Sequence, residues 1–133
     1  MNKIILVIFA AAIFTFMTFG ANEQNSDKID LKIGEAKLVG DAGYSLHFLE
    51  VAEDSRCPDG VDCIWAGRAV VKLVLVKEDQ PLSEFHLEDS GEKNVFEVDG
   101  FRFKLVSLFP KPTADGQPKQ DEYTASISIE KLK

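Results

Sequence analysis

The two cysteines of the chain, Cys57 and Cys63, are separated by five residues, a spacing that admits three kinds of chemistry. The intervening Pro58-Asp59-Gly60 is a turn signal, so the chain can reverse and bring the two sulfurs within bonding reach. A disulfide closing this ring would contribute roughly 2.4 kcal/mol in the chain-entropy model. That is modest for a whole domain, so we predict a disulfide that fixes the shape of a loop.

Redox catalysis and metal binding are the alternatives for these cysteines. Thiol–disulfide catalysts use a tighter Cys-x-x-Cys pair at the start of a helix, and no helical pattern surrounds this ring. A zinc site would need two further ligands. The two histidines, His47 and His86, each sit in a strand pattern typical of a sheet-surface residue. The sequence therefore favours the disulfide and predicts neither a metal nor a cofactor.

Acidic residues around the ring raise the question of calcium binding. Their spacing does not match an EF-hand loop, so a solvated acidic loop is expected instead. Asp54 is expected to accept hydrogen bonds from backbone N–H groups near Ser55 and Arg56. The Arg56 guanidinium is expected either to pair with a carboxylate or to lie over Trp65. The acidic residues concerned are Glu53, Asp54, Asp59 and Asp62.

The same segment supplies a candidate interaction surface. Trp65 is expected to pack against the ring or to plug the end of the domain, which would fasten the loop to the core. Val61 and Ile64 near the tip would then provide apolar contacts, and Arg56 a polar one. The candidate interaction residues are Arg56, Asp59, Val61, Asp62, Ile64 and Trp65.

The first twenty residues read as a secretory signal segment. Lys3 precedes an apolar run from Ile4 to Phe19, and small residues favour cleavage before Ala21. The run is short for a spanning helix, which needs about 20 apolar residues. No cysteine follows it for lipidation, so we predict no stable membrane anchor after cleavage. The predicted organisation is a signal peptide (1–20), a flexible lead-in (21–27) and one domain (28–133).

The predicted export and the net charge limit which partners and which compartment are expected for this protein. The whole chain carries a formal net charge of −7; removal of Lys3 leaves 14 basic against 22 acidic residues, or −8. This balance disfavours nucleic acids and anionic membrane surfaces as partners. Disulfides persist in oxidising compartments, so a periplasmic or secreted protein is expected.

Period-two alternation of apolar residues dominates the mature chain and predicts strands. Tyr44, Leu46 and Phe48 alternate, but Leu49 and Val51 take up the opposite phase, and this change predicts a β-bulge. The apolar run from Ala69 to Val76 predicts a central strand buried on both faces. Asp99-Gly100 predicts a hairpin between two strands, and residues 110–121, with three prolines, predict a long exposed loop. Further strands are predicted around Ile29–Ile33, Phe85–Leu87 and Tyr123–Ile129.

These elements predict an all-β domain of about seven to eight short strands. An antiparallel β-sandwich, of immunoglobulin-like type, or a partly open barrel would accommodate them. No convincing helical periodicity is present.

The motif Ser55-Arg56-Cys57-Pro58, Gly60-Val61, Cys63 and Trp65-Ala66-Gly67 is similar to one found in a group of uncharacterised small exported bacterial proteins. These proteins carry an SRCP-x-G-V-x-C-x-W-A-G signature, and some are lipoproteins. The resemblance covers residues 53 to 76 and implies a β-rich exported domain without a particular activity. This chain departs from the lipoprotein members because it lacks a lipidation cysteine.

Taken together, these features predict a binding or interaction module rather than an enzyme. The cysteine loop and the 110–121 loop would contact an unknown protein or an envelope component. A secreted protease inhibitor and a structural envelope protein are the alternatives, and a metal-binding or enzymatic protein is disfavoured. The sequence contains neither a Gly-x-Ser-x-Gly elbow nor a His-Glu-x-x-His motif.

Overall fold

The computed structural model describes residues 26–40 and 43–132. The predicted signal segment and most of the predicted lead-in lie outside the described residues. The strands are β1 (Ser26–Lys32), β2 (Ala36–Val39), β3 (Tyr44–Asp54), β4 (Ala69–Lys77), β5 (Gln80–Glu88), β6 (Val95–Val98), β7 (Phe101–Phe109) and β8 (Thr124–Lys131). Two short 3-10 helices accompany them, η1 (Glu92–Asn94) and η2 (Gln120–Glu122).

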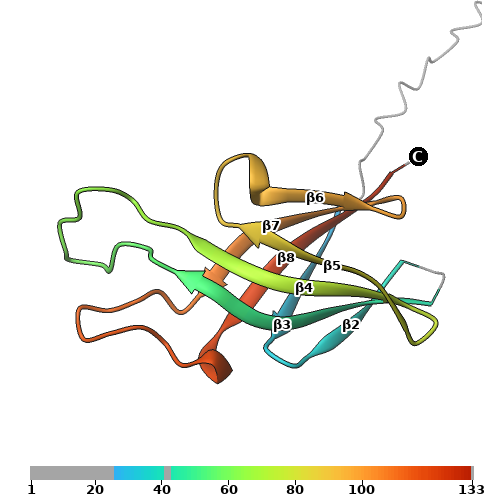
Figure 1. Ribbon diagram of the computed structural model, residues 1–133, viewed down its shortest axis with the longest axis horizontal. Coiled ribbons are helices and arrows are strands. Elements are labelled where there is room, and N and C mark those ends of the chain that lie inside the picture. Colours follow the sequence, from blue (N-terminus) through green and yellow to red (C-terminus); the bar gives the residue numbers. More distant parts are fainter. Residues whose placement is uncertain (1–25, 41–42, 133) are drawn as a thin grey trace, which may run out of the picture.

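The strands form two antiparallel four-stranded sheets, in the orders β1-β8-β7-β6 and β2-β3-β4-β5 (Figure 1). Buried residues of both sheets meet in one apolar core, and the described residues form no closed barrel. The predicted β-sandwich is therefore confirmed. Four consecutive strands, β2 to β5, make up one sheet, an order that differs from the ABED and CFG sheets of immunoglobulin domains.

The β4 strand is central, as predicted, but only one of its faces is deeply buried. Val71, Leu73 and Leu75 have no exposed surface and point into the core between the sheets. Lys72 and Val74 alternate with them and are half-buried on the outer face. The prediction of burial on both faces was wrong because no further layer of the described residues covers this side of the sheet.

The β3 strand carries two bulges where it pairs with β4, one between Phe48 and Glu50 and one between Val51 and Glu53. The first moves the buried phase from Phe48 to Val51, which confirms the predicted bulge, but Leu49, which was predicted to share the new phase, is exposed. The second restores the original phase, so Asp54 at the end of the strand points inward. Two bulges thus place a carboxylate beneath the cysteine loop.

A tight turn connects β6 to β7 and sets the pairing of these two strands. Asp99 and Gly100 both have positive φ, 48° and 81°, and form the predicted hairpin between β6 and β7.

The β1 strand begins at Ser26, two residues before the predicted start of the domain. The β2 strand was not predicted, because Ala36 to Val39 shows no alternation and Leu38 is exposed at its outer side.

The two longest connections extend from the same end of the sandwich (Figure 1). The β3–β4 loop spans residues 55–68 and holds both cysteines. The β7–β8 connection spans residues 110–123 and includes η2. The topology therefore brings the β3–β4 loop and the β7–β8 connection, hereafter the proline-rich loop, together at one end of the sandwich.

Candidate functional site

A disulfide joins Cys57 and Cys63, whose Cα atoms are 6.0 Å apart. The predicted pairing is confirmed. Inside the ring, Gly60 has a φ of 78° and the backbone N–H of Val61 donates to the carbonyl of Pro58 at 3.2 Å. The Pro-Asp-Gly sequence thus reverses the chain as its residue types predict.

Below the ring, Ser55 and Arg68 pair across the base of the β3–β4 loop. The Ser55 N–H donates to the Arg68 carbonyl at 2.8 Å, and the Arg68 N–H donates to the Ser55 Oγ at 3.0 Å. Gly67 lies against this pair with a φ of 64°, and a Cβ there would stand 1.7 Å from the Ser55 carbonyl oxygen. Only glycine allows the two sides of the loop to approach this closely.

A buried ion pair lies where the loop joins the domain. Arg56 donates to both carboxylate oxygens of Asp54, from Nε at 2.7 Å and from Nη2 at 2.8 Å. Their side chains are 11% and 1% exposed. Asp54 also accepts a hydrogen bond from the Arg56 backbone N–H at 3.4 Å, as predicted, and one from the Tyr123 hydroxyl at 2.8 Å. Of the two predicted roles for Arg56, pairing with a carboxylate is therefore the correct one.

The electrostatics of this pair follow from burial and hydrogen bonding. Burial by itself would raise the pKa of Asp54, but the hydrogen bonds from Arg56 and Tyr123 and the positive charge of Arg56 outweigh it. The net result is a lowered pKa for Asp54. Burial, followed by the hydrogen bond to Asp54, raises the pKa of Tyr123 well above its usual value. The carboxylate therefore stays ionised and the phenol stays protonated.

Arg56 also joins the two long loops to each other. Its Nη1 donates to the carbonyl of Leu108 at 2.7 Å, and its Nη2 donates to that of Pro110 at 3.0 Å. These carbonyls lie at the end of β7 and the start of the proline-rich loop. Four of the five N–H groups of the guanidinium are thus used within the domain, two on Asp54 and two on backbone carbonyls. Arg56 is thus part of the scaffold that holds the two loops, and its role as a polar contact for a partner stays a prediction.

Two glutamines fasten the proline-rich loop to β3. Gln120 accepts a hydrogen bond from the Val51 N–H and donates one to the Val51 carbonyl, both at 3.0 Å. Gln117 donates to the carbonyl of Asp54. The loop is therefore anchored at its second half. Sequence reasoning missed Gln117, Gln120 and Tyr123, because each contacts a residue more than 60 positions away.

The tip of the β3–β4 loop exposes apolar side chains to solvent. Ile64 is 92% exposed and Trp65 is 77% exposed, and Val61 is also exposed. The prediction that Trp65 fastens the loop to the core was therefore wrong. The Asp54–Arg56–Tyr123 cluster carries out that anchoring, and the Trp65 side chain is exposed to solvent.

The candidate acidic residues of the tip, Asp59 and Asp62, are exposed. Asp59 forms a long ion pair with Lys111 of the proline-rich loop, with 3.8 Å between Oδ1 and Nζ. Between the two loops lies an open hollow of about 430 Å³. Its lining consists of Asp59, Phe109, Pro110, Lys111, Pro112 and Thr113.

The histidines lie on the sheet rather than in the loops. His47 is half-buried on β3 and its ring shares a hydrogen bond with the Ser45 hydroxyl at 3.0 Å, whereas His86 is exposed on β5. Among residues 26–40 and 43–132, no three His, Cys, Asp or Glu side chains come close enough to hold a metal ion. Within the same ranges, no helix has the length and apolar character to cross a membrane.

Comparisons with protein-family models, with curated proteins and with solved structures gave no match. The candidate site is an exposed apolar tip, formed by Val61 of the disulfide ring and by Ile64 and Trp65 next to it. Its base is held by the Ser55–Arg68 backbone pair and by the buried Asp54–Arg56 ion pair.

Proposed function

We propose that this protein is a binding module of the periplasm or the extracellular space, and that the β3–β4 loop tip is its contact surface. The observation that carries the proposal is the contrast between the tip and its base. Ile64 and Trp65 are almost fully exposed, yet the residues immediately below them are tightly fixed. Large apolar side chains on rigid, exposed loops are characteristic of protein recognition sites.

Rigidity favours binding for an energetic reason. A loop that is ordered before it meets its partner loses less conformational entropy on association. The disulfide, the Ser55–Arg68 pair and the Asp54–Arg56 pair all restrict the loop in the free protein. The predicted signal segment and the disulfide both support an extracytoplasmic location.

Pull-down from envelope extract tests this function. The mature protein is compared with a double variant, Ile64→Asp with Trp65→Ala, and with Leu38→Asp as the control. Leu38 is 80% exposed but lies on β2, outside the loops. We expect a discrete partner that the double variant fails to capture and that the control retains. An identical set of captured proteins for all three would rule out the tip as the contact surface.

A secreted protease inhibitor is a narrower form of the same proposal. A convex, braced loop with a protruding side chain suits insertion into the cleft of an enzyme. The exposure of the Ile64 and Trp65 side chains, 92% and 77%, is the observation that favours this form. Inhibition of one member of a panel of secreted proteases, lost in the Ile64→Asp variant, would support it. Full activity of every protease at micromolar protein would dismiss it.

A further inference from the structure

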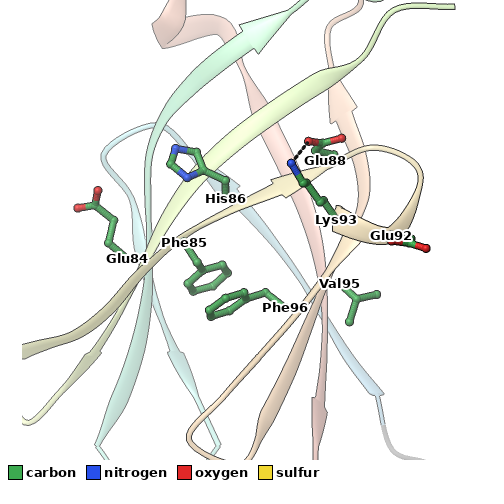
Figure 2. Close-up of a pocket in the computed structure, with 8 residues that line it drawn as sticks. All are labelled: Glu84, Phe85, His86, Glu88, Glu92, Lys93, Val95 and Phe96. Atoms are coloured by element: carbon green, nitrogen blue, oxygen red, sulfur yellow. Dashed lines mark ion pairs between the residues drawn. The ribbon is translucent and has the colours of Figure 1, made fainter.

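A groove of about 400 Å³ lies at one flank of the sandwich, separate from the two long loops (Figure 2). It forms where β5, at the edge of one sheet, faces η1 and β6, at the edge of the other. The side chains that line it are Glu84, Phe85, His86, Glu88, Glu92, Lys93, Val95 and Phe96.

The floor of the groove is aromatic. Phe85 and Phe96 come from opposite sheets, and their rings stack with centroids 4.5 Å apart and planes 8° from parallel (Figure 2). Phe85 is buried, Phe96 is half-buried and Val95 is exposed at the rim. An apolar side chain entering the groove would therefore meet an apolar surface that is already in place.

The backbone of β5 borders the groove as an open sheet edge. With nine residues, β5 is the longest of the four edge strands, and within the described residues only β4 pairs with it. Asn94 of η1 donates to the Glu88 carbonyl at 2.8 Å, so this carbonyl faces away from β4. Because peptide groups alternate in direction along a strand, the backbone groups of Glu84 and His86 face the same open side.

The charged side chains of the groove are mostly acidic. Among the lining residues, Glu84, Glu88 and Glu92 contribute three carboxylates and Lys93 one ammonium group. Glu84 also pairs with Lys72 at 3.0 Å and Glu88 with Arg68 at 3.1 Å, and these two cations are shared with Glu50 and Glu53. Lys93 is highly exposed and reaches Glu88 only at 3.9 Å, so it can move aside easily. Five carboxylates against three cations leave the groove and the ion pairs beside it with a net charge of −2, which suits a cationic occupant.

We propose that this groove binds an extended segment of another protein, in which basic and apolar residues alternate, as an added strand on β5. The backbone of the segment would bond to Glu84 and His86. Side chains of an added strand point alternately to the two faces of the sheet. One row would lie over Phe96, which requires apolar residues, and the other beside Glu84 and Glu88, which requires Lys or Arg.

A second copy of this chain is a poorer occupant for the same edge. Pairing β5 with the β5 strand of another molecule would bring Glu84 and Glu88 close to the same carboxylates of the partner. Like charges across a strand pair are destabilising, and the whole chain already has a net charge of −7. The charge of the groove thus selects a basic segment over self-association.

Titration with a defined peptide tests the proposal. The probe is the blocked peptide Lys-Val-Lys-Phe-Lys-Val-Lys, followed by amide chemical shifts in NMR spectra. We expect shifts confined to residues 82–88 and 92–96 and saturation below about 1 mM. A peptide with Glu in place of Lys should not bind. Backbone N-methylation on the edge-facing side of the probe should abolish binding, because it removes strand pairing.

Two charge reversals provide the matched comparison. Glu84→Lys lies in the groove, whereas Glu50→Lys lies outside it, and both residues pair with Lys72 in the native protein. We expect Glu84→Lys to weaken probe binding by about tenfold or more and Glu50→Lys by less than about twofold. Equal effects, shifts outside the groove, absence of binding, or dimerisation through β5 would each overturn the proposal. Because this groove is separate from the loop tip, none of these outcomes bears on the proposed function.

Discussion

Arg56 binds both carboxylate oxygens of Asp54, two residues before it in the chain, and this buried pair supports the exposed tip of the β3–β4 loop. The guanidinium also reaches the carbonyls of Leu108 and Pro110, which belong to the other long connection. One side chain therefore positions two loops at once. Because Arg56 anchors the base of the β3–β4 loop from within the domain, the base is rigid and the apolar side chains of the tip remain exposed.

Replacing the carboxylate tests the role of this pair. Asp54→Asn should lower the free energy of unfolding by about 3 kcal/mol, because it leaves the buried Arg56 charge without its counterion. The estimate lies at the lower end for such changes since Arg56 keeps two carbonyl partners. Urea denaturation measures the loss. Glu97→Gln, which breaks the exposed Arg102–Glu97 pair, is the control and should cost less than about 1 kcal/mol.

Acid should weaken the same pair. The pKa of Asp54 is lower in the folded protein than its ordinary value of about 3.9, so the folded state binds this proton less readily than the unfolded chain does. The stabilisation is therefore fully present above about pH 4 and is lost as the pH falls through the lowered pKa. Unfolding free energies measured from pH 7 to pH 2 should fall less steeply for Asp54→Asn than for the native protein. Parallel curves would show that Asp54 does not contribute to acid sensitivity.

The sequence predicted one half of this arrangement. It placed Arg56 either on a carboxylate or over Trp65, and it placed Asp54 at a local turn. It gave no sign of Tyr123, because a contact across 69 positions depends on how the sheet that contains β3 packs against the sheet that contains β8, the strand that Tyr123 precedes. Without that partner, Trp65 was the only large side chain near the ring, so it was assigned the anchoring role that the buried cluster performs.

The fold was more predictable than the site. Alternation between polar and apolar residues identifies a strand from its own sequence, as in Phe101–Phe109 and Thr124–Lys131. The first bulge of β3 also left a signal, because the apolar phase changes after Phe48, whereas the second bulge was not predicted. By contrast, Leu38 lies in an exposed edge strand whose sequence has no period-two pattern. The apolar pattern of the sequence therefore predicts the core strands well and the exposed edge strands poorly.

Reduction of the disulfide should loosen the tip without unfolding the domain. The ring lies beyond the Ser55–Arg68 pair and the Asp54–Arg56 pair, both of which remain after the bond is cut. We expect a loss of at most about 2.4 kcal/mol from a seven-residue ring. Hydrogen exchange should rise within residues 57–66 and stay unchanged at the loop base. Cooperative unfolding on reduction would contradict this assignment of roles.

Glycine at position 67 should be required by space as well as by backbone conformation. A Cβ in Gly67→Ala would collide with the Ser55 carbonyl, whereas a Cβ in Gly60→Ala would meet no atom within 4 Å. Both residues have positive φ, so both substitutions carry about 1–2 kcal/mol of backbone strain. Thermal denaturation should therefore show a clearly larger loss for Gly67→Ala. Equal losses would mean that the close approach of the two sides of the loop is not essential.

Site-specific photocrosslinking from the loop tip tests the central claim most directly. A photoreactive benzoylphenylalanine is placed at Ile64, which is 92% exposed, and separately at Leu38, which is 80% exposed on β2. After irradiation in envelope extract, position 64 should yield a discrete crosslinked protein that position 38 does not. The absence of any crosslink from position 64, or the same products from both positions, would contradict the assignment of the braced loop as the binding site.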